Sequence, residues 1–243
     1  MSARIELQPA WVLHARPYQN SSLLVDFFSL DFGRLRAVAR GARRAGSRTR
    51  ALLQPFHPLL ITLVGRHELK TLSAVESSHA AMSLQGPRLF SGLYLNELLV
   101  RLLHGQEAHG DLYRSYQQAI IALSGERDVA STLRRFELSL LEALGYGLNL
   151  EVDCRTGEPI TPLGHYLFLE DEGFERIAHV SDFPSHAHVM FTGAELCALR
   201  RCDFAEAAHA RAALRLTRMA LQRLLGEKPL ASRELFLSAH PRA

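Results

Sequence analysis

Hydrophobic and polar positions along residues 1–80 alternate as in short β-strands rather than with the period of a helix. Five segments fit this pattern: residues 10–16, 22–29, 34–40, 58–64 and 68–76. Leu30-Asp31-Phe32-Gly33 separates the second and third segments and is typical of a turn, because glycine accepts a positive φ. The links are short except for residues 41–56. Five short strands with one longer excursion favour a small closed barrel, and the OB-fold is the leading candidate.

The rest of the chain has mostly helical periodicity. We expect helices over residues 88–103, 111–123, 128–144, 204–225 and 232–239. Pro87 suits the first turn of the first of these helices, where its missing N–H costs nothing. Residues 146–192 are rich in turn formers and predict irregular structure with one hairpin over 166–177. The predicted fold class is therefore α+β, with a barrel domain over residues 1–80 and a mostly helical domain over residues 81–243.

Basic residues gather in the barrel domain. Residues 1–80 hold eleven basic and five acidic residues, whereas residues 81–243 hold seventeen and twenty. No acidic residue lies between Asp31 and Glu68. Seven arginines fall within seventeen residues of this acid-free stretch: Arg34, Arg36, Arg40, Arg43, Arg44, Arg48 and Arg50. Protein surfaces usually mix both signs of charge, so this stretch indicates an anionic partner.

The spacing of the arginines favours nucleic acid as that partner. In a strand, Arg34 and Arg36 lie mainly on one face, and residues 41–50 read as a flexible basic loop beside them. A guanidinium group offers a planar fork of donors that matches phosphate oxygens. A basic strand face with a basic loop can follow a phosphate backbone and release its counterions. The alternative is an ordinary solvated surface.

Three aromatic residues lie near the arginine cluster in the sequence. Tyr18, Phe28 and Phe32 could stack on bases. The burial habits of aromatic side chains favour a place in the core for each of them.

Two adjacent arginines occur in the middle of the third predicted helix. Arg134 and Arg135 point about 100° apart on a helix. One of them can pair with Glu137 or Glu142, which leaves the other for an acidic ligand. Two apolar residues beside them can supply a floor: Leu138 and Leu141. The alternative is an ordinary exposed helix face.

A third group of arginines lies on the helix predicted over residues 204–225. Arg211, Arg215 and Arg218 share one stripe, because they are spaced by four and three residues. The stripe is a candidate secondary DNA track, and a solvated face opposite the core is an equally good interpretation.

The sequence gives little support for a metal site or a catalytic site. Cys197 and Cys202 are five residues apart and do not share a helix face, and Cys154 has no C-x-x-C partner. His186 and His188 would share a strand face, but no second pair of ligands accompanies them. Phosphate-binding and nucleophile-elbow motifs are absent from the sequence. We therefore expect a protein without cofactor or metal that is not an enzyme.

The sparse cysteines also bear on the compartment. Three cysteines without a disulfide framework fit a reducing environment. The first twenty residues carry charges and lack the apolar core of a secretory signal. We expect a cytoplasmic protein.

Short motifs along nearly the whole chain resemble the RecO family of DNA-repair proteins. They are Trp11-Val-Leu-His-Ala-Arg-Pro17, Gly33-Arg-Leu-Arg36, Ala39-Arg-Gly-Ala-Arg43, Leu53-Gln-Pro-Phe56, Leu69-Lys-Thr-Leu72, Gly92-Leu-Tyr-Leu-Asn-Glu-Leu98, Leu133-Arg-Arg-Phe-Glu137, Leu144-Gly-Tyr-Gly147 and Ser232-Arg-Glu-Leu235. Their order and spacing carry the resemblance. It implies an OB-fold that binds nucleic acid, followed by a helical domain.

The resemblance also implies function and partners. It implies binding of single- and double-stranded DNA, annealing of complementary strands, and loading of the RecA recombinase at gaps near the nucleoid. Implied partners are RecR and the acidic C-terminal tail of the single-stranded-DNA-binding protein. The arginines of residues 34–50 match the barrel's DNA face, and the tail would meet Arg134 or Arg135 with Leu138 and Leu141. Some members carry two C-x-x-C zinc pairs, but here only Cys154 is present and Gly157 stands where the next ligand would fall, so the insert near residues 146–192 resembles the zinc-free type.

Three other functions are compatible with the residues. An OB-fold with a basic loop also suits RNA, and competition between single-stranded DNA and structured RNA separates the two. A metal-dependent hydrolase using His186 and His188 would show nuclease activity with divalent metal. A pure adaptor with an idle basic loop would bind DNA weakly at any salt concentration. Sequence leaves open the oligomeric state, the stoichiometry with RecR, the stacking aromatics and any motion between domains.

Overall fold

The computed structural model of the chain describes residues 4–179 and 184–239. The chain forms two compact units, Met1–Val129 with Lys228–Ala243, and Ala130–Glu227. The predicted change from strands to helices near residue 80 is present. The compact units divide later, however, so the first two long helices belong to the same unit as the strands.

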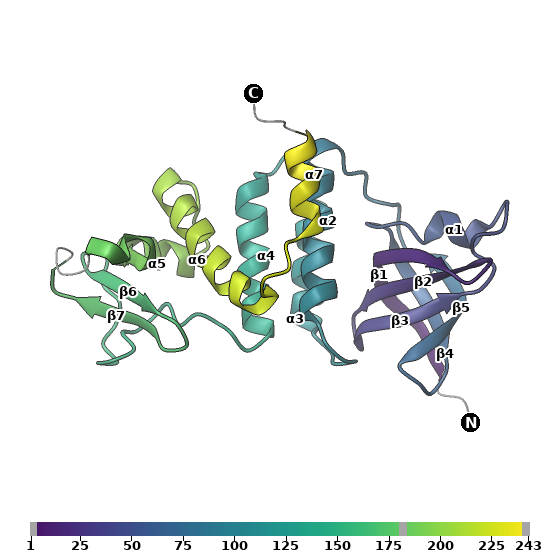
Figure 1. Cartoon of the computed structure of the whole chain (residues 1–243), viewed down its shortest axis with the longest axis horizontal. Helices are drawn as coiled ribbons and strands as arrows, with labels where there is room; N and C mark the ends of the chain where they lie inside the picture. The colour runs from purple at the N-terminus through teal and green to yellow at the C-terminus, as the bar shows by residue number, and fades with distance from the viewer. Residues whose placement is uncertain (1–3, 180–183, 240–243) are drawn as a thin grey trace. The chain divides into compact units, whose positions relative to one another are not determined.

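The first unit contains a closed barrel of five strands. The strands are β1 (Arg4–Tyr18), β2 (Ser22–Ser29), β3 (Gly33–Ala39), β4 (Pro58–Val64) and β5 (Leu69–Ser77), and they follow the order β1-β2-β3-β5-β4. Strands β3 and β5 are parallel, whereas the other neighbours are antiparallel. A short helix, α1 (Arg48–Leu52), follows β3 and precedes β4 along the chain (Figure 1). This order confirms the predicted OB-like barrel.

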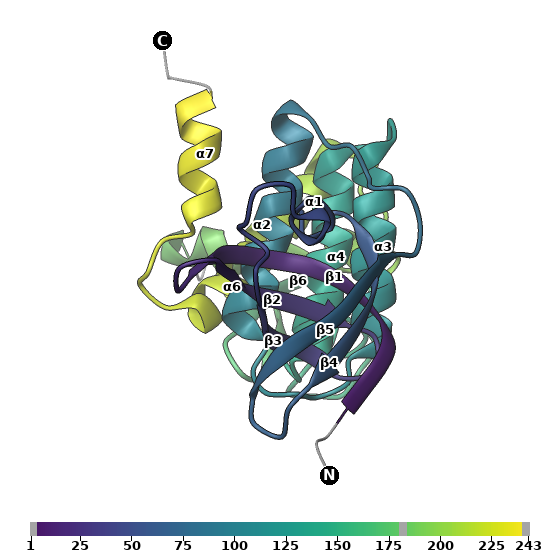
Figure 2. The ribbon, with the colours of Figure 1, turned by 90° about the vertical axis from the view of Figure 1, so that its right-hand side faces the viewer.

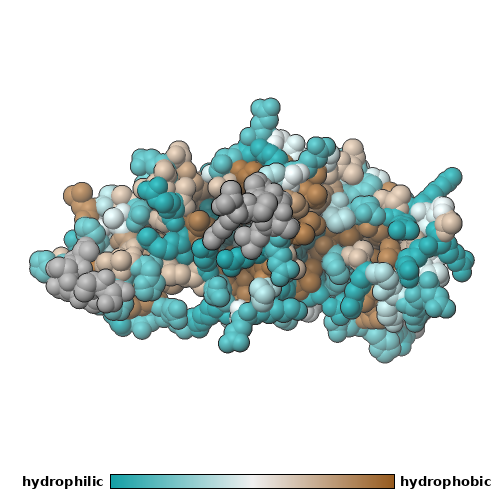
Figure 3. Space-filling model, turned by 45° about the horizontal axis from the view of Figure 1, so that its top comes forward, coloured by the Kyte–Doolittle hydropathy of each residue, from teal (hydrophilic) through white to brown (hydrophobic). Residues whose placement is uncertain are grey.

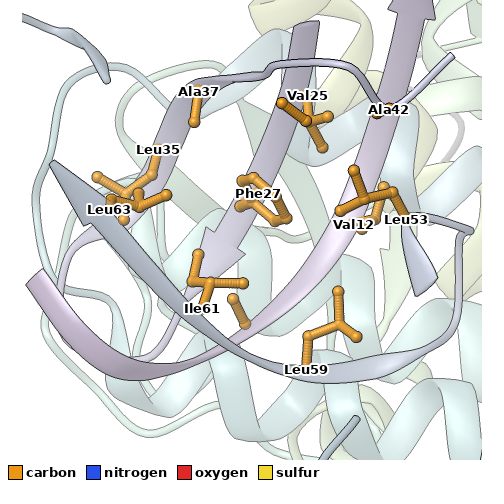
Figure 4. Packing of buried hydrophobic residues seen from close by; sticks show 12 residues of the cluster. Val12, Val25, Phe27, Leu35, Ala37, Ala42, Leu53, Leu59, Ile61 and Leu63 are labelled. Carbon is orange, nitrogen blue, oxygen red and sulfur yellow. The ribbon is translucent and has the colours of Figure 1, made fainter. Parts of the chain in front are cut away.

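Alternating apolar residues fill the barrel. Along β3, the buried residues Leu35, Ala37 and Ala39 alternate with residues that are partly exposed. The inner cluster also includes Val12, Val25, Phe27, Leu59, Ile61 and Leu63 (Figure 4). Each large apolar side chain that is fully buried contributes about 1.5–3 kcal/mol. The cluster thereby determines which side chains of each strand face outward.

Strand β1 is longer than the predicted segment, 10–16. Its first half pairs with β4 from Arg4 to Trp11, and the register shifts between Ile5 and Gln8. Leu7 adopts a positive φ of 45° within this irregularity. The irregularity breaks the alternation of apolar residues, and the strand therefore extends further than its pattern indicates. Its length lets β1 pair with both β2 and β4, which closes the barrel.

Two helices cover the outer side of β1 and β2. They are α2 (Gly86–Leu102) and α3 (Gly110–Ser124) (Figures 1 and 2). The ring of Tyr116 meets Trp11 and Phe28 edge to face, with centroids 5.7 and 6.0 Å apart. Its hydroxyl donates to Asn96, whose amide donates in turn to the carbonyl of Leu13 at 3.0 Å. Burial raises the pKa of the Tyr116 hydroxyl, so it remains a hydrogen-bond donor.

The end of the chain returns to the first unit. Helix α7 (Ala231–Ala239) lies beside α2 (Figure 1). Arg101 of α2 donates to the carbonyls of Lys228 and Pro229 at 2.8 and 3.2 Å. This contact positions the segment that leads into α7.

The second unit combines helices with a small sheet. Its elements are α4 (Val129–Ala143), β6 (His165–Leu169), β7 (Gly173–Ile177), the 3-10 helix η2 (Pro184–Val189), β8 (Met190–Thr192), α5 (Gly193–Arg200) and α6 (Ala207–Leu225). The predicted hairpin is confirmed as β6 and β7, and β8 adds a third strand that the sequence did not predict. Phe174, Phe191 and Leu196 are among the buried residues of its core.

Residues 146–192 are therefore more regular than predicted. Besides the sheet, they contain a turn organised by Asp153, which is buried. One carboxylate oxygen accepts hydrogen bonds from the backbone N–H groups of Arg155 and Thr156, at 2.6 and 2.9 Å. The other oxygen accepts from the backbone N–H of Arg176 on β7, at 2.7 Å. A single carboxylate thus joins this turn to the hairpin.

Candidate nucleic-acid interface

Two of the clustered arginines lie on the outward face of β3. Arg34 and Arg36 alternate with the inward residues Leu35 and Ala37, as the sequence predicted. The two arginines differ in what they contact. The register pairs Arg36 directly with Asp26 of β2, which is buried, and pairs Arg34 with Phe28, two residues further along β2.

Arg34 is engaged within the protein. Its Nε and Nη2 atoms donate to Asp26 Oδ1 at 3.1 and 2.8 Å. Its Nη1 atom donates to the carbonyls of Val100 and Leu103, at 2.6 and 3.3 Å, where α2 ends. Only 17% of the side chain is exposed. We infer that Arg34 joins the barrel to α2 rather than contacting DNA.

Arg36 keeps much of its guanidinium group at the surface. Its Nε donates to Asp26 Oδ1 at 3.2 Å, while 40% of the side chain remains exposed. Asp26 thus contacts the Nε atom of the guanidinium group, while a large part of the side chain stays exposed. This geometry suits contact with a phosphate oxygen.

The remaining five arginines of the cluster are exposed: Arg40, Arg43, Arg44, Arg48 and Arg50. Among the residues that the structure describes, none of the five pairs with a carboxylate within 4.0 Å. Hydrophilic side chains cover much of the visible outer end of the barrel (Figure 3). The positive charge of this stretch is therefore available to an external anion.

The basic loop is more ordered than the sequence predicted. Arg48 and Arg50 lie in helix α1, and the Ser47 hydroxyl accepts a hydrogen bond from the Arg50 N–H at its start. Before the helix, the Arg44 N–H donates to the Gly41 carbonyl at 3.0 Å, and Gly41 has a φ of 69° that favours glycine. The Arg43 N–H donates to the Ser21 carbonyl of the β1–β2 turn at 2.9 Å. Residues 41–50 therefore form hydrogen-bonded turns and the start of a short helix, whereas the sequence predicted a flexible loop.

Arg134 and Arg135 on α4 have different surroundings. Arg134 is buried, and its Nη2 donates to Glu137 Oε1 at 2.6 Å. Arg135 is exposed, and its guanidinium carbon lies 5.7 Å from the centre of the Phe204 ring. Arg135 is therefore the better placed of the two for an acidic ligand.

A groove of about 490 Å³ lies in the second unit, where Leu138 and Leu141 of α4 form part of its wall. Leu138 and Leu141 contribute to its lining, together with Leu148, Leu150, Leu199, Glu142, Glu151 and Arg200. Sequence reasoning did not single out Arg200. It lies at the end of α5, a helix of eight residues that the sequence pattern did not reveal. The groove therefore combines several leucine side chains with one arginine and two glutamates.

The arginine stripe on α6 is interrupted. Arg211 and Arg218 are exposed, but Arg215 donates to the Met190 carbonyl at 2.7 Å. Its guanidinium carbon also lies 4.2 Å from the centre of the Phe191 ring. Arg215 therefore stabilises the packing of α6 on β8, and the two outer arginines remain for the candidate secondary track.

The residues considered for metal binding do not converge. His186 and His188 are exposed on η2, and all three cysteines are free thiols. Across residues 4–179 and 184–239, no three histidine, cysteine, aspartate or glutamate side chains form a group that could hold a metal ion. In the same part of the chain, no helix is both long and apolar enough to cross a membrane.

A closed five-stranded barrel with outward-facing arginines, followed by helices, defines the chain as an OB-fold type of α+β protein. Residues 1–81 match the family model described as Recombination protein O N terminal, and residues 84–234 match Recombination protein O C terminal. The chain therefore belongs to the recombination protein O family.

Full-length relatives agree with this assignment. The chain is 42% identical to DNA repair protein RecO of Cellvibrio japonicus, over 98% of this chain and 99% of the relative. It is 45% identical to DNA repair protein RecO of Proteus mirabilis, over 94% and 91% of the two chains. The protein of that name from Actinobacillus pleuropneumoniae is 43% identical, over 95% and 94%. The expectation from the sequence motifs is thereby confirmed.

Proposed function

We propose that the protein binds single- and double-stranded DNA through its barrel, anneals complementary strands, and acts in repair and recombination without covalent chemistry. One observation carries the proposal: five clustered arginines are exposed, and none pairs with a carboxylate among the described residues. Phosphate contacts of this kind do not depend on base sequence. Any DNA strand is therefore a ligand.

Annealing follows from the same charge. Two complementary strands repel each other through their phosphates. A surface that carries several guanidinium groups lowers this repulsion and raises the local concentration of both strands. Bases then pair spontaneously, and no nucleotide hydrolysis is required.

The test is strand annealing with Arg43, Arg44 and Arg48 changed to glutamate. We expect annealing to slow at least tenfold, because three charges are reversed within the proposed surface. The matched control reverses three exposed arginines elsewhere: Arg127, Arg176 and Arg233. Equal annealing rates for the two triple variants would refute the role of the barrel surface.

A second part of the proposal concerns the coating protein. The groove lined by Leu138, Leu141 and Arg200 offers apolar side chains and a cation to a short peptide with an apolar end and a carboxylate, although Glu142 and Glu151 also line it. The acidic C-terminal tail of the single-stranded-DNA-binding protein has this chemistry. Holding the tail in one unit and DNA on the other gives two linked sites, which raises the affinity for coated DNA.

Family membership supports the remaining parts of the proposal. Partnership with RecR and loading of RecA on coated DNA, at the nucleoid, complete the proposed pathway. Loading of RecA on coated single-stranded DNA, with and without RecR, tests these steps. A reaction that proceeds equally well without this protein would refute them.

A further inference from the structure

The outward face of the barrel continues from β3 onto β1. Arg16 of β1 pairs with Leu24 of β2, and Leu24 pairs with Val38 of β3. Ala15 packs against the inner cluster, so its neighbour Arg16 points outward, and Arg16 is exposed. One row of outward residues therefore crosses three strands and ends at Arg16.

Tyr18 shares this outward face with Arg16, because residues two apart in a strand point the same way. It pairs with Ser22, which begins β2, and the adjacent pair is Leu23 with Ala39. The register thus places Tyr18 in the row that leads to Arg40. Alternate residues of a strand lie about 7 Å apart, which separates Tyr18 from Arg16. Neighbouring strands lie about 4.8 Å apart, so two strand spacings separate Tyr18 from the row position of Arg40. The long arginine side chains span these distances.

Of the three aromatics near the arginines, Tyr18 is the one that is partly exposed and does not pack against the inner cluster of the barrel. Phe28 is fully buried under α3, and Phe32 packs against the inner cluster of the barrel. Tyr18 is partly exposed and does not belong to that cluster. Its ring therefore offers apolar surface beside two exposed arginines.

The turn that follows Tyr18 is fixed to the basic loop. Gln19 adopts a positive φ of 52°, and its carbonyl accepts a hydrogen bond from Arg43 Nη1 at 3.3 Å. The carbonyl of Ser21 accepts from the Arg43 N–H at 2.9 Å. These bonds hold the β1–β2 turn beside the arginine cluster. A strand of nucleic acid on the arginines would therefore pass close to Tyr18.

We infer that Tyr18 stacks on an unpaired base and that Arg16 holds the phosphate beside it. The inference rests on the proposed binding of DNA by the barrel. Bases of a single strand expose their faces, whereas bases of a duplex are stacked inside it. Tyr18 is thus the residue that favours single-stranded over double-stranded ligands, while the arginines bind both.

Three ligands of equal length separate stacking from charge: oligodeoxythymidine, an abasic strand with the same phosphates, and a duplex. Fluorescence anisotropy titrations in dilute buffer measure the affinity for each. We expect Tyr18→Ala and Tyr18→Leu to weaken binding of oligodeoxythymidine about tenfold. Both variants should bind the abasic strand and the duplex as the wild type does. Tyr18→Phe, which keeps the ring, should bind oligodeoxythymidine within about twofold of the wild type.

Arg16→Ala should weaken binding of all three ligands, because it removes a phosphate contact. Tyr146→Ala changes an exposed tyrosine in the second unit and should change none of them. Oligodeoxythymidine binding unchanged in both Tyr18→Ala and Tyr18→Leu would overturn the inference. An equal loss on the abasic strand would overturn it too, because stacking would not be involved. Failure of the wild type to bind any of the ligands would instead refute the proposed function.

Discussion

The carboxylate of Glu97 on α2 lies at the first turn of α7, where it accepts hydrogen bonds from the backbone N–H and the hydroxyl of Ser232, at 2.8 and 2.7 Å. The backbone N–H of Ala231 donates to its other oxygen at 2.8 Å. The first N–H groups of a helix lack partners within the helix, and negative charge is favoured near them. Glu97 and Ser232 thus join two sequence motifs that lie more than a hundred residues apart.

Removal of this carboxylate should release α7. We expect Glu97→Ala to lower the free energy of unfolding by about 2 kcal/mol, because three donors at the helix start lose a charged acceptor. Amide hydrogen exchange across α7 should accelerate more than exchange across the barrel strands. Glu126→Ala, at an exposed position after α3, is the control. Unaltered exchange in α7 would contradict the proposed role of Glu97.

Asp26 should be among the residues most important for the stability of the first unit. Asp26→Asn leaves Arg34 largely buried without its counter-charge, since the side chains are 7% and 17% exposed. Breaking such a pair from one side costs about 3 kcal/mol. Urea unfolding followed by circular dichroism measures the loss. Asp111→Asn, which breaks the exposed pair with Arg114, should cost less than about 1 kcal/mol. Similar losses in the free energy of unfolding for both variants would show that the buried Asp26–Arg34 pair stabilises the protein no more than an exposed pair does.

Asp153 should make the stability of the second unit depend on acid pH. Burial raises its pKa, but the backbone N–H groups of Thr156, Arg176 and Arg155 lower it by more, so the net shift is downward. A lowered pKa in the folded state stabilises the protein above the unfolded value of about 4. This contribution is lost as the pH falls through the folded value.

Asp153→Asn should therefore destabilise the protein at neutral pH by about 2 kcal/mol. The difference from the wild type should shrink as the pH falls from about 4 through the lower folded value, because the unfolded wild type takes up a proton first and the folded carboxylate follows. Urea unfolding at pH 7 and pH 3, with ellipticity as the signal, measures both values. A constant difference across this range would mean that the charge of Asp153 is not what stabilises the turn.

Arg200 and Arg201 provide a matched pair for the tail groove. Both arginines are exposed at the end of α5, but only Arg200 contributes to the lining of the groove. We expect Arg200→Ala to weaken binding of an acidic peptide with an apolar C-terminal residue about tenfold, because a charge-assisted hydrogen bond is lost. Arg201→Ala should leave the affinity unchanged. Isothermal titration with the peptide compares the two, and equal affinities for both variants would place the peptide elsewhere.

Regular segments could be predicted from the sequence. Strands β2 (Ser22–Ser29) and β4 (Pro58–Val64) have the predicted bounds, because continuous apolar runs between turn residues are typical of buried strands. The long helices begin and end within three residues of the predicted positions, since their apolar stripes repeat over several turns. Short helices were missed. Five residues in α1 and eight in α5 are too few for a helical period to be visible.

The roles of the candidate site residues were harder to predict from the sequence than the fold, because these roles depend on tertiary contacts. Nothing in the sequence distinguishes Arg34 from Arg36, because both alternate with apolar residues on β3. Their difference arises from Val100 and Leu103, more than sixty residues away, whose carbonyls bind only Arg34. Likewise, the sequence named Tyr18 together with Phe28 and Phe32 as candidates for stacking, and only strand register and packing distinguish Tyr18 from the other two.

Gly33 limits where the protein can be modified. A Cβ atom at this position would lie 1.9 Å from the carbonyl oxygen of Glu107, and φ is already 58°. Any side chain there would force apart the β2–β3 turn and the connection between α2 and α3. Fluorophores, affinity tags and inserted peptides should therefore be attached elsewhere. Leu163 is 95% exposed, so this position accepts a probe without disturbing the barrel.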